Sequence, residues 1–450
     1  MAQVQDSKMS KGRHVVIVGA GPVGCLLARL MARRGYRIDV YDSRPEIPLS
    51  EPSMGSRSIN LSLSPRGMKA LRHAGLEDAI LNAAVPMRMR VLHDAAGRQA
   101  TFAYGKEHWR TYSIERNRLN RILALAAAET GAVRFHYEQR CLHYDTSANT
   151  VLFADAAGMQ KSVQADLVVA ADGAYSAIRT ALTRQPQFDY TQQWNANGYK
   201  ELTFRPIEGE YAFEPGAIHI WARNGFFMIA LPNTDRTFRG TLVMPLQGES
   251  SFASLDTPEK IEAFLSVQFP DAFPHLCGSM EEFLQKPIGN MVTVRCGSYH
   301  WRDSVVLMGD AAHAMTPFMG QGVNMGLEDC QIFEGLLERY QDDLSQALPA
   351  YTAVRRQDGE AAADLSLANF AELAGHEASR RTVLLKLLRN WLHRLSPRLV
   401  SPPPIVLVNF LNVSYAEAKE AGKRKGWVWP FHNPALALRR SHASASAAKR

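Results

Sequence analysis

The segment VVIVGAGPVGCLLARL, residues 15–30, decides the fold. A short β-branched run ends at Gly19, and apolar residues at helical spacing follow Pro22. The next run, RIDVYDSR at 37–44, again has the composition of a strand. A strand, a glycine-rich turn, a helix and a second strand within about 30 residues form a βαβ unit.

The glycines of this turn have the spacing GxGxxG, and each has a separate steric role. Gly19 permits the tight turn, Gly21 lets the backbone approach a pyrophosphate, and Gly24 allows the helix to pack closely on the strand. The positive helix N-terminus favours the phosphate charge. Asp42 ends the second strand, where a carboxylate can accept hydrogen bonds from a ribose. The segment therefore predicts a dinucleotide site, but it does not separate NAD from FAD.

A second glycine-rich loop, GDAAHAMTPFMGQGVNMGLED, occupies residues 309–329. Asp310 follows the strand-like run SVVLMG, where its carboxylate can bind a ribityl hydroxyl. Pro317 restricts the loop, while Gly320 and Gly322 let backbone N–H groups face a ligand at the start of the next helix. The alternative is a plain strand–loop–helix connection. Two such loops far apart in one chain indicate one large cofactor, a flavin dinucleotide, held at both ends.

Two further polar residues leave alternatives open. Asp172, in the strand-ending triplet ADG at 171–173, either orients a cofactor or a pyridine nucleotide, or caps the helix that follows. His313 lies near Asp310, but a loop histidine bonded to backbone is more common than a catalytic one.

The apolar patterns predict an α/β fold with an FAD-binding Rossmann-like domain and an inserted antiparallel β-sheet. The texture changes to short alternating strands near residue 186 and returns to a buried parallel strand near 304. We expect a discontinuous cofactor domain, a substrate-binding sheet, a C-terminal helical region and a flexible basic tail. Their ranges are, in that order, 1–80 with 105–185 and 296–345; 81–104 with 186–295; 346–430; and 431–450.

Composition excludes several classes of protein. Of the 450 residues 46% are hydrophobic and 21% charged, which is ordinary for a globular protein. The net charge of +7 comes without a recognisable nucleic-acid module, so no nucleic-acid partner is expected. The five cysteines are scattered, and no metal-ligand spacing, GxSxG motif, signal peptide or membrane-length apolar run is found. We expect a soluble cytoplasmic enzyme without a metal, and a homodimer is one assembly to test.

Three motifs, GAGPVG, ADG and GDAAHAMTPFMGQGVN, resemble in this order the single-component flavoprotein aromatic hydroxylases. Longer segments are similar to one family among them, the kynurenine 3-monooxygenases, over residues 13 to 420. These segments are SRSINLSLSPRGMKAL, VPMRMRVLHD, FDYTQQWNANGYKELTF, EPGAIHIWARNGFFMIALPN and ADLSLANF.

The resemblance implies an FAD-dependent hydroxylase that uses NADPH and O2 in tryptophan catabolism. A flavin C4a-hydroperoxide would hydroxylate L-kynurenine at the 3-position and give 3-hydroxykynurenine. The aniline nitrogen already donates electrons into the ring, so no strong base is needed. The residues implied to bind the cofactors FAD and NADPH are Gly19, Gly21, Gly24, Asp42, Arg44, Arg116, Asp172, Asp310, Gly320 and Gly322.

The resemblance also implies a substrate site, with no certain catalytic side chain. Arg90 and Tyr104 would bind the carboxylate of kynurenine, and Asn369 would assist them. A guanidinium grips a carboxylate through two parallel hydrogen bonds, which a lysine cannot do. The aromatic ring would be walled by Met228, Phe238, Pro317 and Phe318.

Two positions depart from the family pattern. Family members carry a tyrosine where this chain has Ile405, and Phe or His where it has Met319. These departures leave open a substituted kynurenine or another anthranilate-like acid as the substrate. Two alternatives have less support. A flavin-dependent halogenase would need the tryptophan motif WVWP, which lies at 427–430, too near the chain end. A non-catalytic flavin protein would not need the polar and aromatic groups of the matched segments.

Overall fold

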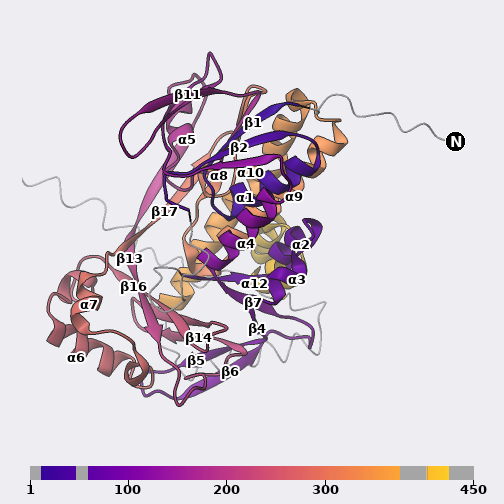
Figure 1. Ribbon diagram of the computed structural model, residues 1–450. Coiled ribbons are helices and arrows are strands. Elements are labelled where there is room, and N and C mark those ends of the chain that lie inside the picture. The colour runs from indigo at the N-terminus through magenta and orange to yellow at the C-terminus, as the bar shows by residue number, and fades with distance from the viewer. Residues whose placement is uncertain (1–11, 47–58, 375–401, 403, 425–450) are drawn as a thin grey trace, which may run out of the picture.

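The structure is a computed structural model that describes residues 12–46, 59–374, 402 and 404–424. One sheet lies at the end of the molecule that carries β1, and a larger sheet lies at the opposite end (Figure 1). Long strands and helices connect the two ends. The predicted tail at 431–450 lies outside the described residues.

A six-stranded sheet carries the first glycine-rich turn. Its order is β18–β19–β12–β1–β2–β8, and every neighbouring pair is parallel except β18 with β19. Nearly all residues of β1, β12 and β19 are buried, as expected for continuous apolar runs in a parallel sheet covered on both faces. The strands are β1 (His14–Val18), β2 (Arg37–Tyr41), β8 (Val133–His136), β12 (Leu167–Ala170), β18 (His300–Trp301) and β19 (Val305–Leu307).

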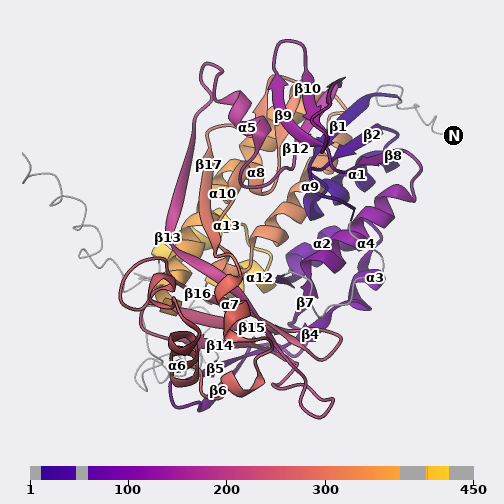
Figure 2. The ribbon, with the colours of Figure 1, turned by 60° about the vertical axis from the view of Figure 1, so that its left-hand side comes forward.

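Helices pack beside this sheet, and a small sheet packs against it. α1 (Pro22–Arg33) contacts both α4 (Arg116–Ala128) and α9 (Gly322–Arg339) (Figure 2). The antiparallel sheet β11–β10–β9 joins the same core through Phe153, which stacks on Tyr41 with ring centroids 4.0 Å apart. Its strands are β9 (Arg140–Asp145), β10 (Thr150–Ala154) and β11 (Gln160–Gln164), and α5 (Ala177–Leu182) packs on β9.

A seven-stranded sheet forms the other end of the molecule, in the order β17–β13–β16–β15–β14–β5–β6. It is antiparallel apart from the pair β14 and β5. Helices α6 and α7 lie on its outer side (Figure 2). The elements are β5 (Met89–His93), β6 (Gln99–Ala103), β13 (Tyr190–Phe204), β14 (Ala217–Ala222), β15 (Phe227–Pro232), β16 (Phe238–Pro245), β17 (Gly289–Cys296), η1 (Phe252–Ser254), α6 (Pro258–Gln268), η2 (Phe273–His275) and α7 (Met280–Gln285).

Between the two large sheets lies a three-stranded sheet, β3–β7–β4. Within 81–104, which we assign to the substrate domain, β4 pairs with β7 here, while β5 and β6 join the seven-stranded sheet. These elements are β3 (Asn60–Leu63), α2 (Pro65–His73), α3 (Glu77–Leu81), β4 (Val85–Met87) and β7 (Thr111–Glu115).

The C-terminal part of the described chain is helical, as its sequence predicts. Its long helix α10 packs against α9 and α13, and α12 reaches α2. Within the described ranges, no helix combines the length and the apolar character that crossing a membrane requires. The helices are α8 (Asp310–His313), η3 (Pro317–Met319), α10 (Leu344–Ala374), α12 (Pro404–Phe410) and α13 (Tyr415–Arg424).

Candidate active site

A cavity of about 930 Å³ lies between the two large sheets. Both glycine-rich loops reach it: Gly21 lines it from the first, and Asp310, Gly320 and Gly322 line it from the second. Strands of the seven-stranded sheet and helix α12 form its other walls. Segments about 300 residues apart in the chain therefore meet around one space, as the two-loop interpretation predicts.

The first loop has the geometry expected of its three glycines. Gly19 has φ +106°, and a Cβ there would lie 2.3 Å from the carbonyl oxygen of Ala171. A Cβ at Gly24 would lie 2.0 Å from the carbonyl oxygen of Gly19. A Cβ at Gly21 would meet open space on the cavity side. Packing therefore requires Gly19 and Gly24, while Gly21 leaves room for a ligand beside the start of α1.

Asp42 is buried and holds this loop in place. Its Oδ2 accepts a hydrogen bond from the backbone of Ala20 at 2.7 Å, and Arg44 donates to both carboxylate oxygens. Burial disfavours the charged carboxylate, but the bonds from Arg44 and Ala20 outweigh it and lower the pKa of Asp42. Asp42 and Arg44 do not line the cavity, so their contact with a cofactor stays a prediction.

Asp172 contacts the start of α5, whose N-cap residue is Ser176. Oδ2 of Asp172 accepts a hydrogen bond from the N–H of Ala177 at 2.8 Å, while Oγ of Ser176 accepts from the N–H of Arg179 at 2.9 Å. Burial raises the pKa of Asp172. Ala171 and Gly173 line the cavity, but Asp172 does not. Asp172 therefore supports the helix start beside the N-cap Ser176, and its contact with a cofactor stays a prediction.

The second loop presents the start of a long helix to the cavity. Gly320 has φ +63°, in the left-handed region, and α9 begins at Gly322. Asn324 donates through Nδ2 to the carbonyl oxygens of Gly320 at 2.8 Å and Ser62 at 2.9 Å. Asp310 is exposed to the cavity, and a Cβ at Gly322 would lie 3.8 Å from its Oδ1. The loop thus offers a carboxylate and a positive helix end to one ligand.

His313 has a different partner from the expected backbone group. It is 1% exposed, and its Nε2 lies 2.6 Å from Oδ2 of Asp329. Burial opposes the charge of Asp329, but His313 and Arg355 outweigh it and lower the pKa of that carboxyl. His313 does not line the cavity, so it supports the loop from behind.

The apolar wall of the cavity comes from alternate residues of β15 and β16. Phe227, Ile229, Leu231, Thr241 and Val243 line it, together with Pro317 and Phe318 of the loop.

The prediction that Met228 and Phe238 wall the same space is wrong. Both side chains lie in the hydrophobic cluster on the opposite face of the sheet, against α6 and α7. Because side chains alternate along a strand, residues next to the wall residues point away from the cavity.

One cavity end carries the predicted carboxylate-binding pair. The guanidinium of Arg90 lies 5.7 Å from the ring centroid of Tyr104, and the Tyr104 hydroxyl is 3.4 Å from Thr111 Oγ1. Phe410 of α12 packs on Tyr104 and stacks on Trp109 with centroids 4.9 Å apart. These aromatic rings join α12 to the loop that follows β6.

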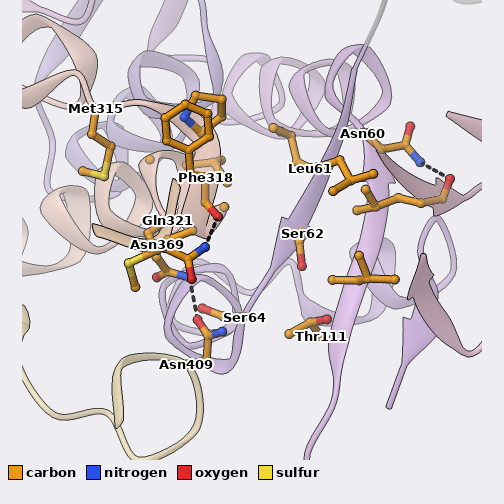
Figure 3. Close-up of a pocket in the computed structure, with 18 of the residues that line it drawn as sticks. Asn60, Leu61, Ser62, Ser64, Thr111, Met315, Phe318, Gln321, Asn369 and Asn409 are labelled. Carbon is orange, nitrogen blue, oxygen red and sulfur yellow. Dashed lines mark hydrogen bonds between the residues drawn. The ribbon is translucent and has the colours of Figure 1, made fainter. Parts of the chain in front are cut away.

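The other predicted contact residues, Arg116 and Asn369, both line the cavity but differ in their surroundings. Arg116 lines the cavity as an exposed residue at the start of α4. Asn369 also lines it, but its Nδ2 donates to the carbonyl oxygen of Phe318 at 2.6 Å (Figure 3). Both departures from the family pattern, Ile405 and Met319, face the cavity. The departures therefore lie where they can affect the choice of substrate.

The cavity wall also carries neutral polar residues that were not among the predicted site residues. They come from β3, the start of α2, β7, the second loop and α12, and several are drawn in Figure 3: Asn60, Ser62, Ser64, Thr111, Gln321 and Asn409. Gln321 donates to Oδ1 of Asn409 at 2.5 Å and accepts from Tyr415. Only Ser64 had a sequence signal, because Ser-Pro before a helical run marks an N-cap.

The residues present fit a flavin dinucleotide. The open space beside Gly21 suits a diphosphate at a helix N-terminus, and the second loop suits the ribityl chain and a ring. No cluster of metal-ligating side chains occurs in the ranges 12–46, 59–374 and 404–424.

Comparisons with known proteins agree with this geometry. A solved structure of p-nitrophenol 4-monooxygenase PnpA from Pseudomonas putida DLL-E4 matches with a TM-score of 0.67 at 19% identity, covering 86% of this chain and 98% of that one. The family model described as FAD binding domain matches residues 13–366. Fold and site together define an FAD-dependent protein with the aromatic hydroxylase fold.

Relatives of higher identity narrow this class. A kynurenine 3-monooxygenase of Sus scrofa is 38% identical over 416 residues, covering 92% of this chain and 87% of the relative. One of Myxococcus xanthus (strain DK1622) is 39% identical over 420 residues, covering 92% and 90%. The chain belongs to the kynurenine 3-monooxygenase family of FAD-dependent monooxygenases.

Proposed function

We propose that this chain hydroxylates L-kynurenine at ring carbon 3, with FAD as cofactor and NADPH and O2 as co-substrates, and gives 3-hydroxykynurenine. Bound FAD supplies the redox chemistry, taking electrons from NADPH and activating O2. One observation supports the choice of kynurenine as substrate. A single cavity is lined by an arginine, by an apolar wall and by the glycine-rich loop with Asp310. Membership of the family supports the same reaction.

Arg90 and Tyr104 bind the amino-acid end of the substrate in this proposal. Arg90 is half-buried on β5 and faces the cavity. Its guanidinium can form two parallel hydrogen bonds to a carboxylate, and Tyr104 adds a hydroxyl beside it. This grip fixes the distance from the carboxylate to the aromatic ring.

The apolar wall holds the ring and excludes water. Ile229 and Leu231 of β15 line the cavity together with Phe318 of the second loop. Asn369 assists by fixing the backbone of Phe318, to which it donates a hydrogen bond. Since the aniline nitrogen activates the ring, no basic side chain has to remove a proton before attack. A dry, rigid wall is then the main contribution of this region.

The cofactor is held by both glycine-rich loops. The diphosphate would be held at Gly21, inside the turn that Gly19, Gly24, Asp42 and Arg44 maintain. The cofactor domain in this proposal comprises 1–80, 105–185 and 296–345, and the substrate domain 81–104 and 186–295. Further contacts come from Arg116, Asp310, Gly320 and Gly322, while Asp172 acts through the start of α5, to which it is hydrogen-bonded.

A second candidate substrate is a substituted kynurenine or another anthranilate-like acid. The observation that favours it is Ile405, an apolar residue on the cavity wall where family members carry a tyrosine. A panel of ring-substituted kynurenines separates the two candidates. If one of them exceeds kynurenine by a wide margin in kcat/KM, the second candidate replaces the first.

We also propose that the enzyme is soluble and cytoplasmic, in keeping with its scattered free cysteines. A homodimer stays a prediction. Fractionation of cells and sedimentation of the purified protein test both.

The test of function joins substrate kinetics to product analysis. In stopped-flow experiments, L-kynurenine should accelerate reduction of the bound flavin by NADPH, and 3-hydroxykynurenine should form. Arg90→Ala removes a charge-assisted pair of about 1.5–3 kcal/mol, which corresponds to a rise in KM of roughly 10- to 150-fold. Arg88→Ala is the matched control, because Arg88 is exposed and lies outside the cavity. NADPH oxidation that yields only peroxide, or equal KM values for the two variants, would contradict the proposal.

A further inference from the structure

Ser64 occupies a cap position without acting as a cap. It precedes α2 with φ −88° and ψ 168°, the backbone of an N-cap residue, but its side chain makes no capping hydrogen bond. The residue is 1% exposed, and within the described part of the chain its Oγ has no hydrogen-bond partner. Ser64 also lines the cavity. A buried hydroxyl without a partner is costly, so this one is available for a ligand.

Asn324 of α9 lies over the start of α2. Its Oδ1 accepts a hydrogen bond from the backbone N–H of Ser64 at 2.8 Å. A Cβ at Gly67, in the first turn of α2, would lie 2.4 Å from the same Oδ1. The Asn324 side chain therefore occupies the space over the start of α2. Ser64 lines the cavity, and its unpartnered hydroxyl is available to a ligand there.

The same asparagine brings two helix N-termini to one corner of the cavity. Its Nδ2 donates to Gly320, just before α9 begins, while its Oδ1 lies over the start of α2. Neither helix has an acidic residue in its first turn to offset the positive end. Figure 3 shows Ser64 among the polar side chains of this end. The corner therefore suits an electron-rich or anionic oxygen.

We propose that the Ser64 hydroxyl donates a hydrogen bond to the oxygen-bearing pyrimidine edge of the bound flavin ring and stabilises the reduced, negatively charged cofactor. The proposal rests on FAD binding in the proposed function, but not on the identity of the aromatic substrate. Asn324 ties Ser64 to Gly320, on the loop that also carries Asp310. Arg90 on β5 supplies a cation for the substrate carboxylate, and the link through Asn324 to Gly320 and the start of α9 assigns the Ser64 hydroxyl to the cofactor.

The test is the midpoint potential of the FAD-loaded enzyme, measured by spectroelectrochemistry without any aromatic ligand. Ser64→Ala should shift the equilibrium roughly tenfold toward the oxidised cofactor, which lowers the potential by about 30 mV for two electrons. Ser64→Thr, which keeps the hydroxyl, should restore it. Thr241→Val is the matched control, because it removes a cavity hydroxyl on β16 of the seven-stranded sheet, away from β3 and α2, and should leave the potential unchanged.

Melting of the cofactor-free protein separates this role from a structural one. Since Ser64 makes no capping bond, Ser64→Ala should leave the melting temperature of the apoprotein unchanged. Ser64→Gly serves as a second variant, because glycine is tolerated at N-caps. An unchanged midpoint potential in Ser64→Ala overturns the proposal. In that case a raised KM for kynurenine would indicate a substrate contact, and a lower melting temperature of the apoprotein would indicate a structural role. Failure to hydroxylate kynurenine would sink the proposed function and leave this measurement standing.

Discussion

The two faces of the seven-stranded sheet are formed by the same strands, but one packs against helices and the other lines the cavity. On β15, Ile229 faces the cavity, and its neighbour Met228 packs against the outer helices. On β16, Val243 and Leu242 divide in the same way. The outer face is filled by its own side chains, whereas the cavity face is left open for ligands. Stability should therefore depend on the outer face and substrate choice on the cavity face.

The outer face also contains a network of hydrogen-bonded polar side chains. Nδ1 of His93 lies 2.5 Å from Asp271, and its Nε2 lies 2.8 Å from His219. Trp221 donates to Asp271, and Nε2 of His219 bonds to the carbonyl oxygen of Glu214. The cavity face has no histidine among its described lining residues. The two faces should thus respond differently to pH as well as to truncation.

The largest expected effect is that of Phe238→Ala. Phe238 is fully buried on the outer face, so its loss leaves a cavity and should lower the free energy of unfolding by about 3–5 kcal/mol. KM for kynurenine should stay unchanged, because the side chain points away from the substrate. Guanidinium denaturation and steady-state kinetics measure the two quantities. A raised KM with normal stability would reverse the assignment of the faces.

The second effect is a pH dependence of stability. Burial lowers the pKa of His219 to about 4. The unfolded chain, with a histidine pKa near 6.5, binds more protons between those values, so stability falls as pH drops through this window, by at most about 3 kcal/mol. His219→Asn should remove this component of the slope. Denaturation at pH 7, 6, 5 and 4 compares the two proteins, and identical slopes would exclude His219 as the source.

The smallest effect belongs to the cavity face. Ile229→Val removes one methylene from a half-buried wall residue, so the free energy of unfolding should change by less than about 1 kcal/mol. The change in kcat/KM should be about tenfold, since one methylene in an apolar pocket contributes about 1 kcal/mol or somewhat more. Competition between kynurenine and ring-substituted analogues measures it. A loss of stability as large as that of Phe238→Ala would erase the difference between the faces.

Much of the fold could be predicted because it depends on local patterns. The run at 15–30 combines a short apolar segment, a glycine turn and apolar residues at helical spacing. In the structure these become the buried strand β1, Gly19 with its positive φ, and helix α1. The alternating texture after residue 186 likewise predicts the antiparallel sheet. The wrong predictions concern direction. Met228 and Phe238 are large and apolar, but their sequence does not state which face of the sheet meets the cavity.

The amino-acid sequence by itself determined the local backbone structure: the glycine turns and the periods of the strands and helices. It also showed a charged residue, Arg90, among apolar neighbours. Tertiary structure decided which groups meet. Asn324 reaches Ser64 across 260 residues, and His313 finds Asp329 instead of backbone. The physical reason is that a side chain's partner depends on how separate elements pack, whereas turn geometry and periodicity depend on residues adjacent in the chain.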